Sequence, residues 1–300
     1  KLSGSVRSTP FSFRMTTSED GKDFLTNYII TSPYLQSTDS NVISKITASQ
    51  TSLSAQKVVM VNPSDEDLEK FGLKTPYSVA EISVAVKTKE ESEESSESSG
   101  SDKDVKYRYY NVRQHVITLG GKDDDGNYYC MVDDVPLVYV ISADSVPWAT
   151  SQYDDVVVKM LFMKDITSLD SVTITASGKD NVFHFEHFPD AENADGKLKV
   201  TVDGEVYPTG DFRTLYQFLM KITRLGPAEV EPSGDPFMTI RITPSEDMGE
   251  EIVVEFYEAS GTSYTCRLQS GETFRVSSVT VTNMLKNMER YLNGEELVHN

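Results

Sequence analysis

The residues of this chain that could carry out chemistry are few, and the first group lies in the stretch FHFEHF, residues 183–188. In an extended strand successive side chains point to opposite faces, so His184 and Glu186 share one face, and Phe183 and Phe185 share the other. A zinc site needs three or four converging ligands, and the sequence brings only this pair together. We therefore predict that His184 and Glu186 lie on the outer face of a strand, and we predict no metal site.

A second candidate is the acidic stretch KDDDGN, residues 122–127. A calcium-binding EF-hand loop requires oxygen ligands at alternate positions, glycine at position six and glutamate at position twelve. Counted from Asp123, Gly126 is fourth and the twelfth residue is Asp134. Because Asp and Gly also favour hairpin turns, the stretch predicts a turn between two strands.

Nucleophile and phosphate-binding motifs are absent or incomplete. No Gly-x-Ser-x-Gly elbow occurs, and Ser54 to Lys57 match Ser-x-x-Lys without the companion motifs of a penicillin-binding enzyme. The glycines of LGGKDDDG, residues 119–126, precede a strand pattern and not a helix, so they do not form a phosphate-binding loop. We therefore predict no catalytic residue and no cofactor.

Aromatic residues offer a possible interaction surface. The stretch YRYYNV, residues 107–112, places Tyr107 and Tyr109 on one strand face and Tyr110 on the other. Such a surface can bind a glycan or a protein, and it is also typical of an exposed sheet edge. Trp148 is either a ligand-stacking residue or a residue that fills the gap between a sheet and a connecting helix.

Charge and composition exclude several classes of function. The formal net charge of -19 repels phosphate backbones, so neither nucleic acid nor an anionic membrane surface is expected as a partner. No apolar run is long enough to span a membrane. The chain starts at Lys1 without an initiator Met, as expected of a protein trimmed of an export signal or anchor, although a trimmed cytoplasmic protein would look the same.

An internal repeat organises the sequence. At an offset of 172 positions, Phe11 falls on Phe183 and Phe13 on Phe185, and the apolar residues of 43–53 fall on those of 215–225. At an offset of 136, residues 127–142 fall on 263–278, so Cys130 and Cys266 occupy the same place in each copy. Equivalent strands of tandem copies seldom meet, and we therefore predict two free thiols.

The strand and helix patterns within each copy predict an α+β fold of two tandem diverged repeats. Each repeat is expected to be a mostly antiparallel β-sheet with one long amphipathic helix packed on it. We predict a first β-β-α-β copy over 1–150, with an acidic Ser-rich loop at 87–104. A connecting helix is expected over 151–165, and the second copy over 166–300. The second copy is expected to carry a helix N-capped by Asp211 and a C-terminal helix over 281–292.

The first copy carries an additional stretch, DEDLEKFGLKTP, residues 65–76. Its three leading carboxylates suit the first turn of a helix, where the helix dipole favours negative charge. Gly72 is suited to end that helix with positive φ, and Pro76 prevents its continuation. The stretch therefore predicts a short helix followed by a corner into a strand.

Four motifs of the first copy resemble the bacterial family of domains of unknown function numbered 4340. They are DLEKFGLKTP (67–76), HVITLGG (115–121), NYYCMV (127–132) and PLVYVIS (136–142), and the likeness covers about residues 40–230. The second copy lacks the Gly-Leu-Pro element. The resemblance implies a domain that is exported or tethered by an N-terminal segment, in some cases encoded near transporter-type components linked to surface or gliding functions. No catalytic residue is established for the family.

These observations lead to one main hypothesis and two alternatives. The main hypothesis is a non-catalytic binding or scaffold module of the bacterial cell envelope, located outside the cytoplasm as a lipoprotein-type or secreted protein. Its expected partner is another envelope protein of a transport or surface complex, and its expected contact with the membrane is through an N-terminal anchor alone. The alternatives are a secreted hydrolase with a glycan or peptide substrate in a cleft between the copies, and a solute-binding protein. The oligomeric state stays open.

Overall fold

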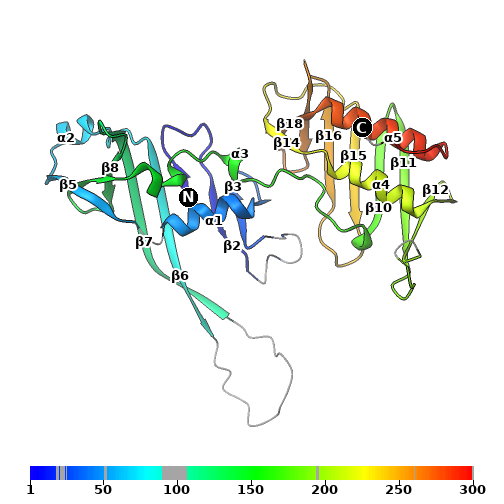
Figure 1. Ribbon diagram of the computed structural model, residues 1–300, viewed down its shortest axis with the longest axis horizontal. Helices are drawn as coiled ribbons and strands as arrows, with labels where there is room; N and C mark the ends of the chain where they lie inside the picture. The colour runs from blue at the N-terminus through cyan, green and yellow to red at the C-terminus, as the bar shows by residue number, and fades with distance from the viewer. Residues whose placement is uncertain are drawn as a thin grey trace, which may run out of the picture. The chain divides into compact units, whose positions relative to one another are not determined.

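The computed structural model describes residues 1–17, 20, 24, 26–50, 53–89, 107–193, 196–259 and 261–298. Within these ranges, the side chains of residues 85–89 and 107–112 are not described. The chain divides into two compact units (Figure 1). Unit 1 is Lys1–Phe13, Ile30–Pro33 and Ser40–Val156; unit 2 is Arg14–Ile29, Tyr34–Asp39 and Val157–Asn300. Both are α+β with mostly antiparallel sheets, which confirms the predicted class.

Unit 1 contains a six-stranded sheet in the order β1-β6-β7-β8-β9-β5. The strands are β1 (Leu2–Ser3), β5 (Ala55–Val61), β6 (Ser78–Lys89), β7 (Tyr107–Lys122), β8 (Tyr128–Val132) and β9 (Leu137–Ile141). Helix α1 (Ser40–Gln50) belongs to the same unit and buries Ile43 and Ile46. Beyond residue 89, the loop predicted over 87–104 lies outside the described residues.

The predicted corner after residue 65 is present in unit 1. Helix α2 (Asp65–Lys70) begins with a capping box, in which Ser64 accepts a hydrogen bond from Asp67 N and the Asp67 side chain accepts one from Ser64 N. Gly72 has φ +71°, and Leu73 N donates to Leu68 O at 2.8 Å, which closes the last turn. Phe71 and Leu73 then pack on Val138 of the sheet. The corner is therefore architectural.

The corner contacts the glycine pair at the end of β7. Gly121 N donates to Phe71 O at 2.8 Å. A Cβ placed on Gly120 would lie only 2.2 Å from that same carbonyl oxygen. The pairing of β7 with β8 shifts register between Leu119 and Lys122, where the glycines lie. Two of the motifs that carry the family resemblance, FGL and LGG, are therefore joined in space.

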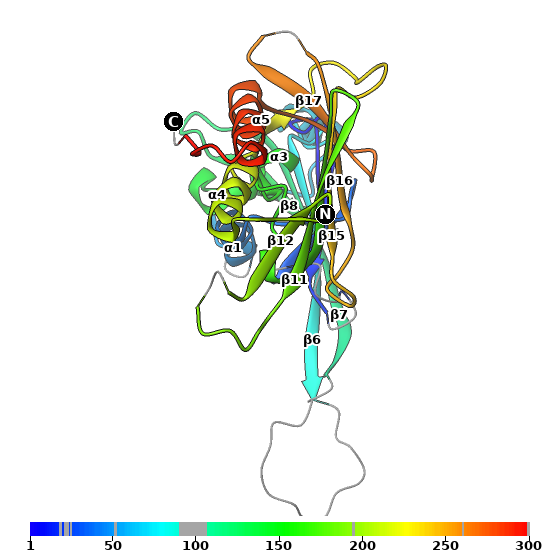
Figure 2. The same cartoon turned by 90° about the vertical axis from the view of Figure 1, so that its right-hand side faces the viewer.

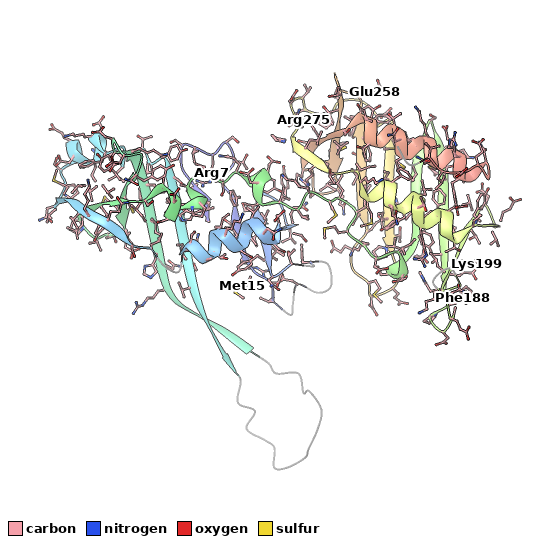
Figure 3. All side chains as sticks on the ribbon, viewed as in Figure 1. Arg7, Met15, Phe188, Lys199, Glu258 and Arg275 are labelled. Atoms are coloured by element: carbon pink, nitrogen blue, oxygen red, sulfur yellow. The ribbon has the colours of Figure 1, made fainter. Side chains whose placement is uncertain are left out.

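A buried arginine ties distant segments of unit 1 together. Arg7 (labelled in Figure 3) donates from Nε to Ser151 O at 2.9 Å and from Nη1 to Ser78 Oγ at 2.8 Å. It also donates to Ser3 O at 2.6 Å and to the carbonyl oxygen of Trp148. Burial lowers the pKa of Arg7 to about 10, so it keeps its charge at neutral pH. Its role is to hold the N-terminal segment against β6 and the segment after β9.

Unit 2 contains a nine-stranded sheet in the order β13-β12-β11-β10-β15-β16-β17-β18-β14. The strands are β10 (Leu169–Ala176), β11 (Lys179–His187), β12 (Leu198–Val202), β13 (Glu205–Tyr207), β14 (Arg224–Pro227), β15 (Met238–Pro244), β16 (Ile252–Tyr257), β17 (Ser263–Leu268) and β18 (Thr273–Ser277). Helices α4 (Thr209–Met220) and α5 (Ser278–Leu292) cover one face of this sheet (Figure 2).

The core of unit 2 lies between this sheet and its two helices. The ring centroid of Phe212 lies 5.1 Å from the ring centroids of Phe183 and Phe185, and 5.8 Å from that of Tyr291 on α5. The aromatic face of β11 is therefore buried, as its alternation predicts. α4 begins at Thr209, so the prediction that Asp211 caps it is wrong: Asp211 lies inside the first turn, and Pro208 holds the cap position.

The helix predicted over 151–165 is wrong over most of its length. Only α3 (Tyr153–Val156) is helical. The residues that follow use their backbone for other pairing, because Val158 N donates to Ser37 O at 3.0 Å and Lys159 O accepts from Arg224 N at 2.9 Å. An apolar run that is buried against neighbouring strands has the same sequence appearance as a buried helix.

A third sheet contains three strands in the order β2-β3-β4, and its residues are divided between the two units. The strands are β2 (Ser12–Met15), β3 (Tyr28–Ser32) and β4 (Gln36–Ser37). None of the described helices combines the length and the apolar composition needed to cross a membrane.

Candidate functional site

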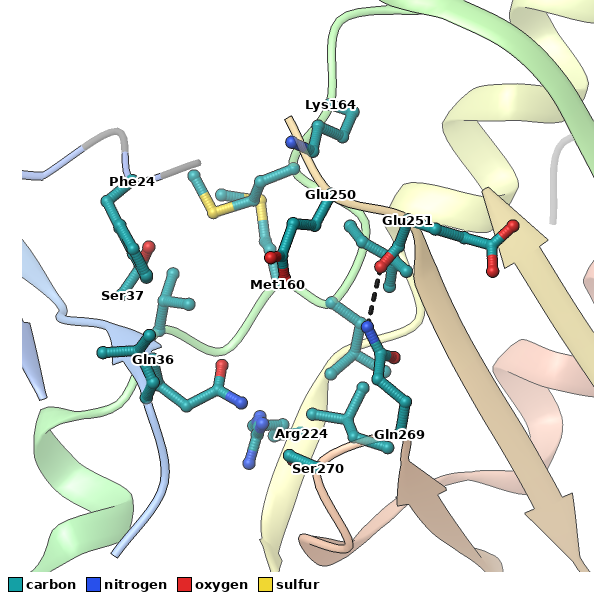
Figure 4. A pocket seen from close by; sticks show the side chains of 16 residues that line it. Phe24, Gln36, Ser37, Met160, Lys164, Arg224, Glu250, Glu251, Gln269 and Ser270 are labelled. Carbon is teal, nitrogen blue, oxygen red and sulfur yellow. Dashed lines mark hydrogen bonds between the residues drawn. The ribbon is translucent and has the colours of Figure 1, made fainter. Parts of the chain in front are cut away.

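Unit 2 has a pocket with a volume of about 330 Å³ (Figure 4). Its 16 lining residues come from the segment between β2 and β3, from β4 and the residue before it, and from the segment 158–164. Others come from the start of β14 and from the β15–β16 and β17–β18 connections with the adjoining strand ends. All of them belong to unit 2. A volume of this size is at the lower end of the range for sites that bind small molecules.

A buried ion pair lies at the pocket. Arg224 lines the pocket and donates to both carboxylate oxygens of Glu272, from Nη1 at 2.5 Å and from Nη2 at 2.8 Å. Only 2% of the Arg224 side chain and 3% of the Glu272 side chain are exposed. This two-pronged geometry is the strong form of the arginine–carboxylate interaction, and here it is shielded from water.

Two more side chains complete this network. Gln36 Nε2 donates to Glu272 Oε2 at 2.9 Å, across 236 positions of sequence. The Arg224 guanidinium carbon lies 4.2 Å from the ring centroid of Phe274. Figure 4 shows the Gln36 amide and the Arg224 guanidinium pointing toward one another. Both oxygens of Glu272 therefore accept hydrogen bonds from side chains of the protein, and the carboxylate is engaged within the network.

Backbone pairing fixes the position of this network. Arg224 begins β14, and its amide nitrogen donates to Lys159 O at 2.9 Å. Glu272 closes a tight turn in which Gly271 N donates to Leu268 O at 2.9 Å and Leu268 N donates to Glu272 O at 3.0 Å. Gly271 has φ +84°, a conformation that glycine adopts without a steric penalty. The turn therefore directs Glu272 inward onto Arg224.

The polar rim of the pocket is held by side-chain contacts. Gln269 accepts from Val253 N at 2.8 Å and donates to Glu251 O at 2.7 Å, which joins two loops (dashed line in Figure 4). The Glu251 carboxylate accepts from Arg241 and, at 3.1 Å, from Thr243 Oγ1. The rim is therefore ordered by contacts within unit 2.

The mouth of the pocket is apolar. Leu35 is 56% exposed and Met160 is 40% exposed, whereas Leu161, deeper in the same segment, is buried. Met163 also lines the pocket. Methionine side chains are flexible and polarisable, which suits a surface that adapts to a bound apolar group. Exposed apolar side chains beside a pocket are typical of binding sites.

The lining combines apolar, amide, hydroxyl and charged side chains. The 16 residues include no His and no Cys, and the two serines, Ser37 and Ser270, have no histidine partner in the lining. Across the described part of the chain, no group of three or more His, Cys, Asp or Glu side chains is arranged to hold a metal ion. What the pocket offers a ligand is its exposed apolar side chains, while the buried pair of Arg224 and Glu272 lies beneath them.

The residues singled out in the sequence lie elsewhere. His184 and Glu186 are exposed on β11, and Glu186 accepts from Lys199 Nζ at 2.7 Å, so the predicted outer face is confirmed. The KDDDGN stretch forms the predicted turn: Asp123 Oδ1 accepts from Asn127 N at 2.9 Å, and Gly126 has φ +83°. Neither group contributes to the pocket.

The proposed aromatic surface requires a correction at Trp148. This residue is 0% exposed, so its ring contributes nothing to a surface and packs in the interior of unit 1 instead. Tyr107, Tyr109 and Tyr110 lie on the described backbone of β7, but their side chains fall outside the described part of the structure.

The two cysteines are free, as predicted, and both are buried, on β8 and β17. Burial raises the pKa of the Cys130 thiol to about 12 and also raises the pKa of Cys266. Because the thiolate is the reactive form, we expect neither thiol of the native protein to react with Ellman's reagent at pH 8, and both to react in denaturant. Glutathione at the same concentration is the control, and rapid labelling of one equivalent in the native protein would contradict the expectation.

Sequence reasoning missed Gln36, Arg224 and Glu272. Each is a common polar residue without a local motif, and the three come together only through the fold. The one local signal is the turn around Gly271, which places Glu272 directly before β18, a strand of alternating polar and apolar residues.

A protein-family model matches the chain. The model is described as a domain of unknown function (DUF4340), and it matches residues 29–225, a range that contains Gln36 and Arg224 and ends before Glu272. No curated protein and no solved structure matches the chain. Because the matched range covers more than half of the 300 residues, this protein belongs to the family defined by the domain of unknown function DUF4340.

Proposed function

We propose that this protein is a non-catalytic binding module of the bacterial cell envelope, and that the pocket of unit 2 holds its ligand. One observation carries the proposal: an apolar mouth, with Leu35 and Met160 exposed, opens on a pocket in which the buried charges of Arg224 and Glu272 already satisfy one another. A site of this kind can hold a group without transforming it.

The same observation disfavours a hydrolase. Glycoside hydrolysis requires two carboxyl groups on either side of the scissile bond, one of them able to exchange a proton. Three carboxylates lie at this pocket. Glu272 is bound by Arg224 and Gln36, Glu251 is bound by Arg241 and Thr243, and Glu250 is exposed in the lining. Two of these three carboxylates are thus engaged in structural contacts, and the third does not by itself provide the pair that the reaction requires.

The envelope location rests on the family resemblance, which implies export or an N-terminal anchor, and on the acidic charge of -19. The proposed partner is another envelope protein of a transport or surface complex. Fractionation of cells that produce the full-length protein should recover it with the envelope, where it should be sensitive to protease added from outside the cytoplasm. Recovery in the cytoplasmic fraction would contradict this location.

We also propose that the two units arose by duplication. The order β6-β7-β8-β9-β5 in unit 1 corresponds to β15-β16-β17-β18-β14 in unit 2. At the offset of 136, β8 and β9 fall on β17 and β18, and this placement aligns Cys130 with Cys266. The element α2 has no counterpart between β14 and β15, where the chain has no described helix. An experimental structure tests the proposal, since these five-strand sets should superpose with both cysteines at one position.

Site-specific photocrosslinking tests the binding function. With benzoylphenylalanine at position 35 or 160 of the full-length protein in its own cells, we expect a crosslink to a defined envelope component. The matched control is position 206, because Val206 is 67% exposed on β13 of the same unit and lies outside the pocket. Equal crosslinking from positions 35 and 206 would argue against the pocket as the binding site.

A further inference from the structure

We infer that the pocket of unit 2 receives an apolar side chain from a positively charged segment of a partner protein. This inference rests on the proposed binding function and adds the chemical class of the partner. It is carried by two properties of the same place: the apolar mouth of the pocket, and the acidic loop that forms part of its rim.

The acidic loop joins β15 to β16. Its sequence from residue 245 to residue 251 is SEDMGEE, which contains four carboxylates and no cation. Glu246, Asp247 and Glu250 are exposed, and Glu250 and Glu251 line the pocket. Met248, in the middle of the loop, is 40% exposed and adds apolar surface among the carboxylates. A bound segment would therefore meet carboxylates and apolar groups together.

The cations nearest to this rim are engaged by the loop itself or by Glu272, and Arg241 offsets one of the four carboxylates. Arg224 donates to Glu272, Arg241 donates to Glu251, and Lys164 Nζ lies 3.4 Å from Met248 O. The chain as a whole carries a net charge of -19. A field of this sign attracts a basic segment and slows an acidic one, and it acts mainly on the association rate and on the choice of partner.

The apolar mouth explains why the partner should also carry a large apolar side chain. Binding energy at protein interfaces concentrates in a few anchor side chains that fill pockets, and the surrounding polar rim contributes less. A volume of about 330 Å³ lined by Leu35, Met160 and Met163 accommodates one such anchor. The adaptable methionines allow the anchor to be leucine, isoleucine, methionine or phenylalanine.

Selection from a random peptide library tests the inference directly. The full-length protein is immobilised, and phage that display random twelve-residue peptides are selected at low salt. We expect enriched peptides to combine Lys or Arg with a large apolar residue within a few positions. Enriched peptides that are acidic, or that lack an apolar anchor, would overturn the inference, and so would a failure to enrich any peptide.

Substitutions then locate the binding of the best selected peptide, measured by fluorescence polarisation. Leu35→Glu should weaken binding about tenfold or more, because it places a charge where the anchor binds. Joint reversal of the rim by Glu246→Lys, Asp247→Lys and Glu250→Lys should also weaken it about tenfold, with a reduced dependence on salt. Val206 is exposed and lies outside the pocket, so Val206→Glu should change the dissociation constant of the peptide by less than about twofold.

The result separates this inference from the proposed function. If the rim reversal has no effect on peptide binding, or if Leu35→Glu has none, a basic apolar segment is not the occupant of this pocket. Crosslinking from positions 35 and 160 in cells would then still support the pocket as a binding site for a partner of another class. If crosslinking also fails, the proposed function itself is overturned. Circular dichroism of each variant checks that its fold is retained. We expect this because the substituted positions are exposed.

Discussion

Replacement of Gly120 by alanine is expected to destabilise unit 1 by about 3 kcal/mol, the upper range for forced overpacking. The added Cβ would lie 2.2 Å from Phe71 O and 3.1 Å from the carbonyl carbon of Gly72. Both are backbone atoms, so relief requires movement of the whole corner after α2 or of β7. Urea unfolding followed by the fluorescence of Trp148, the single tryptophan and a buried residue of unit 1, measures the loss.

The neighbouring glycine provides a matched control. A Cβ on Gly121 would meet only Phe71 O, at the ordinary contact distance of 3.6 Å. Gly121→Ala should therefore change the unfolding free energy of unit 1 by less than about 1 kcal/mol. Equal losses for the two substitutions would mean that the glycine pair serves strand geometry in general and not the contact with the FGL corner.

This contact illustrates how much of the fold was predictable from sequence. The FGL corner and the LGG strand end were each predicted separately, because capping, positive φ and strand alternation are local properties. The contact between them was not predicted. Gly120 lies 48 positions after Gly72, and nothing in either motif specifies so distant a partner. Strand alternation also predicted the buried face of β11 correctly, with Phe183 and Phe185 inside.

The predictions that were wrong share a cause. The segment after α3 is apolar enough for a helix, but Val158 and Lys159 use their backbone groups to pair with Ser37 and Arg224. For Trp148 two alternatives stood open, a surface residue that stacks on a ligand or a residue that fills an internal gap, because an aromatic side chain alone does not reveal its burial. Its burial in unit 1 excludes the surface alternative. In both cases tertiary contacts outweighed the local pattern.

The candidate pocket could not be predicted, because no local sequence pattern marks the residues of its network. Its network unites Gln36, Arg224 and Glu272, which come from three separate segments. Each side chain would look like an ordinary surface residue in a sequence, because Gln, Arg and Glu are usually exposed. Only the fold, which buries Arg224 and Glu272 and brings the half-buried Gln36 onto them, identifies the three as one structural network.

Replacement of Glu272 by glutamine is expected to destabilise unit 2 by about 3–5 kcal/mol, because it leaves the Arg224 charge buried without a counter-ion. Arg224 is only 2% exposed on its side chain, so water cannot readily replace the lost carboxylate. Pulsed alkylation of Cys266 during urea unfolding reports on unit 2, because this thiol is buried in β17. Trp148 fluorescence, which reports on unit 1, should keep its midpoint.

Two further variants decide whether the loss comes from the unpaired charge. Glu186→Gln removes an exposed ion pair with Lys199. The side chain of Lys199 is 38% exposed and that of Glu186 is 55% exposed, so the substitution should lower the unfolding free energy by less than about 1 kcal/mol. The double variant Arg224→Met with Glu272→Leu removes both charges, and it should be more stable than Glu272→Gln alone. A double variant as unstable as Glu272→Gln would show that packing around Phe274, and not charge compensation, gives Glu272 its importance. That outcome would also argue against mutual charge compensation as the main role of the buried Arg224–Glu272 pair.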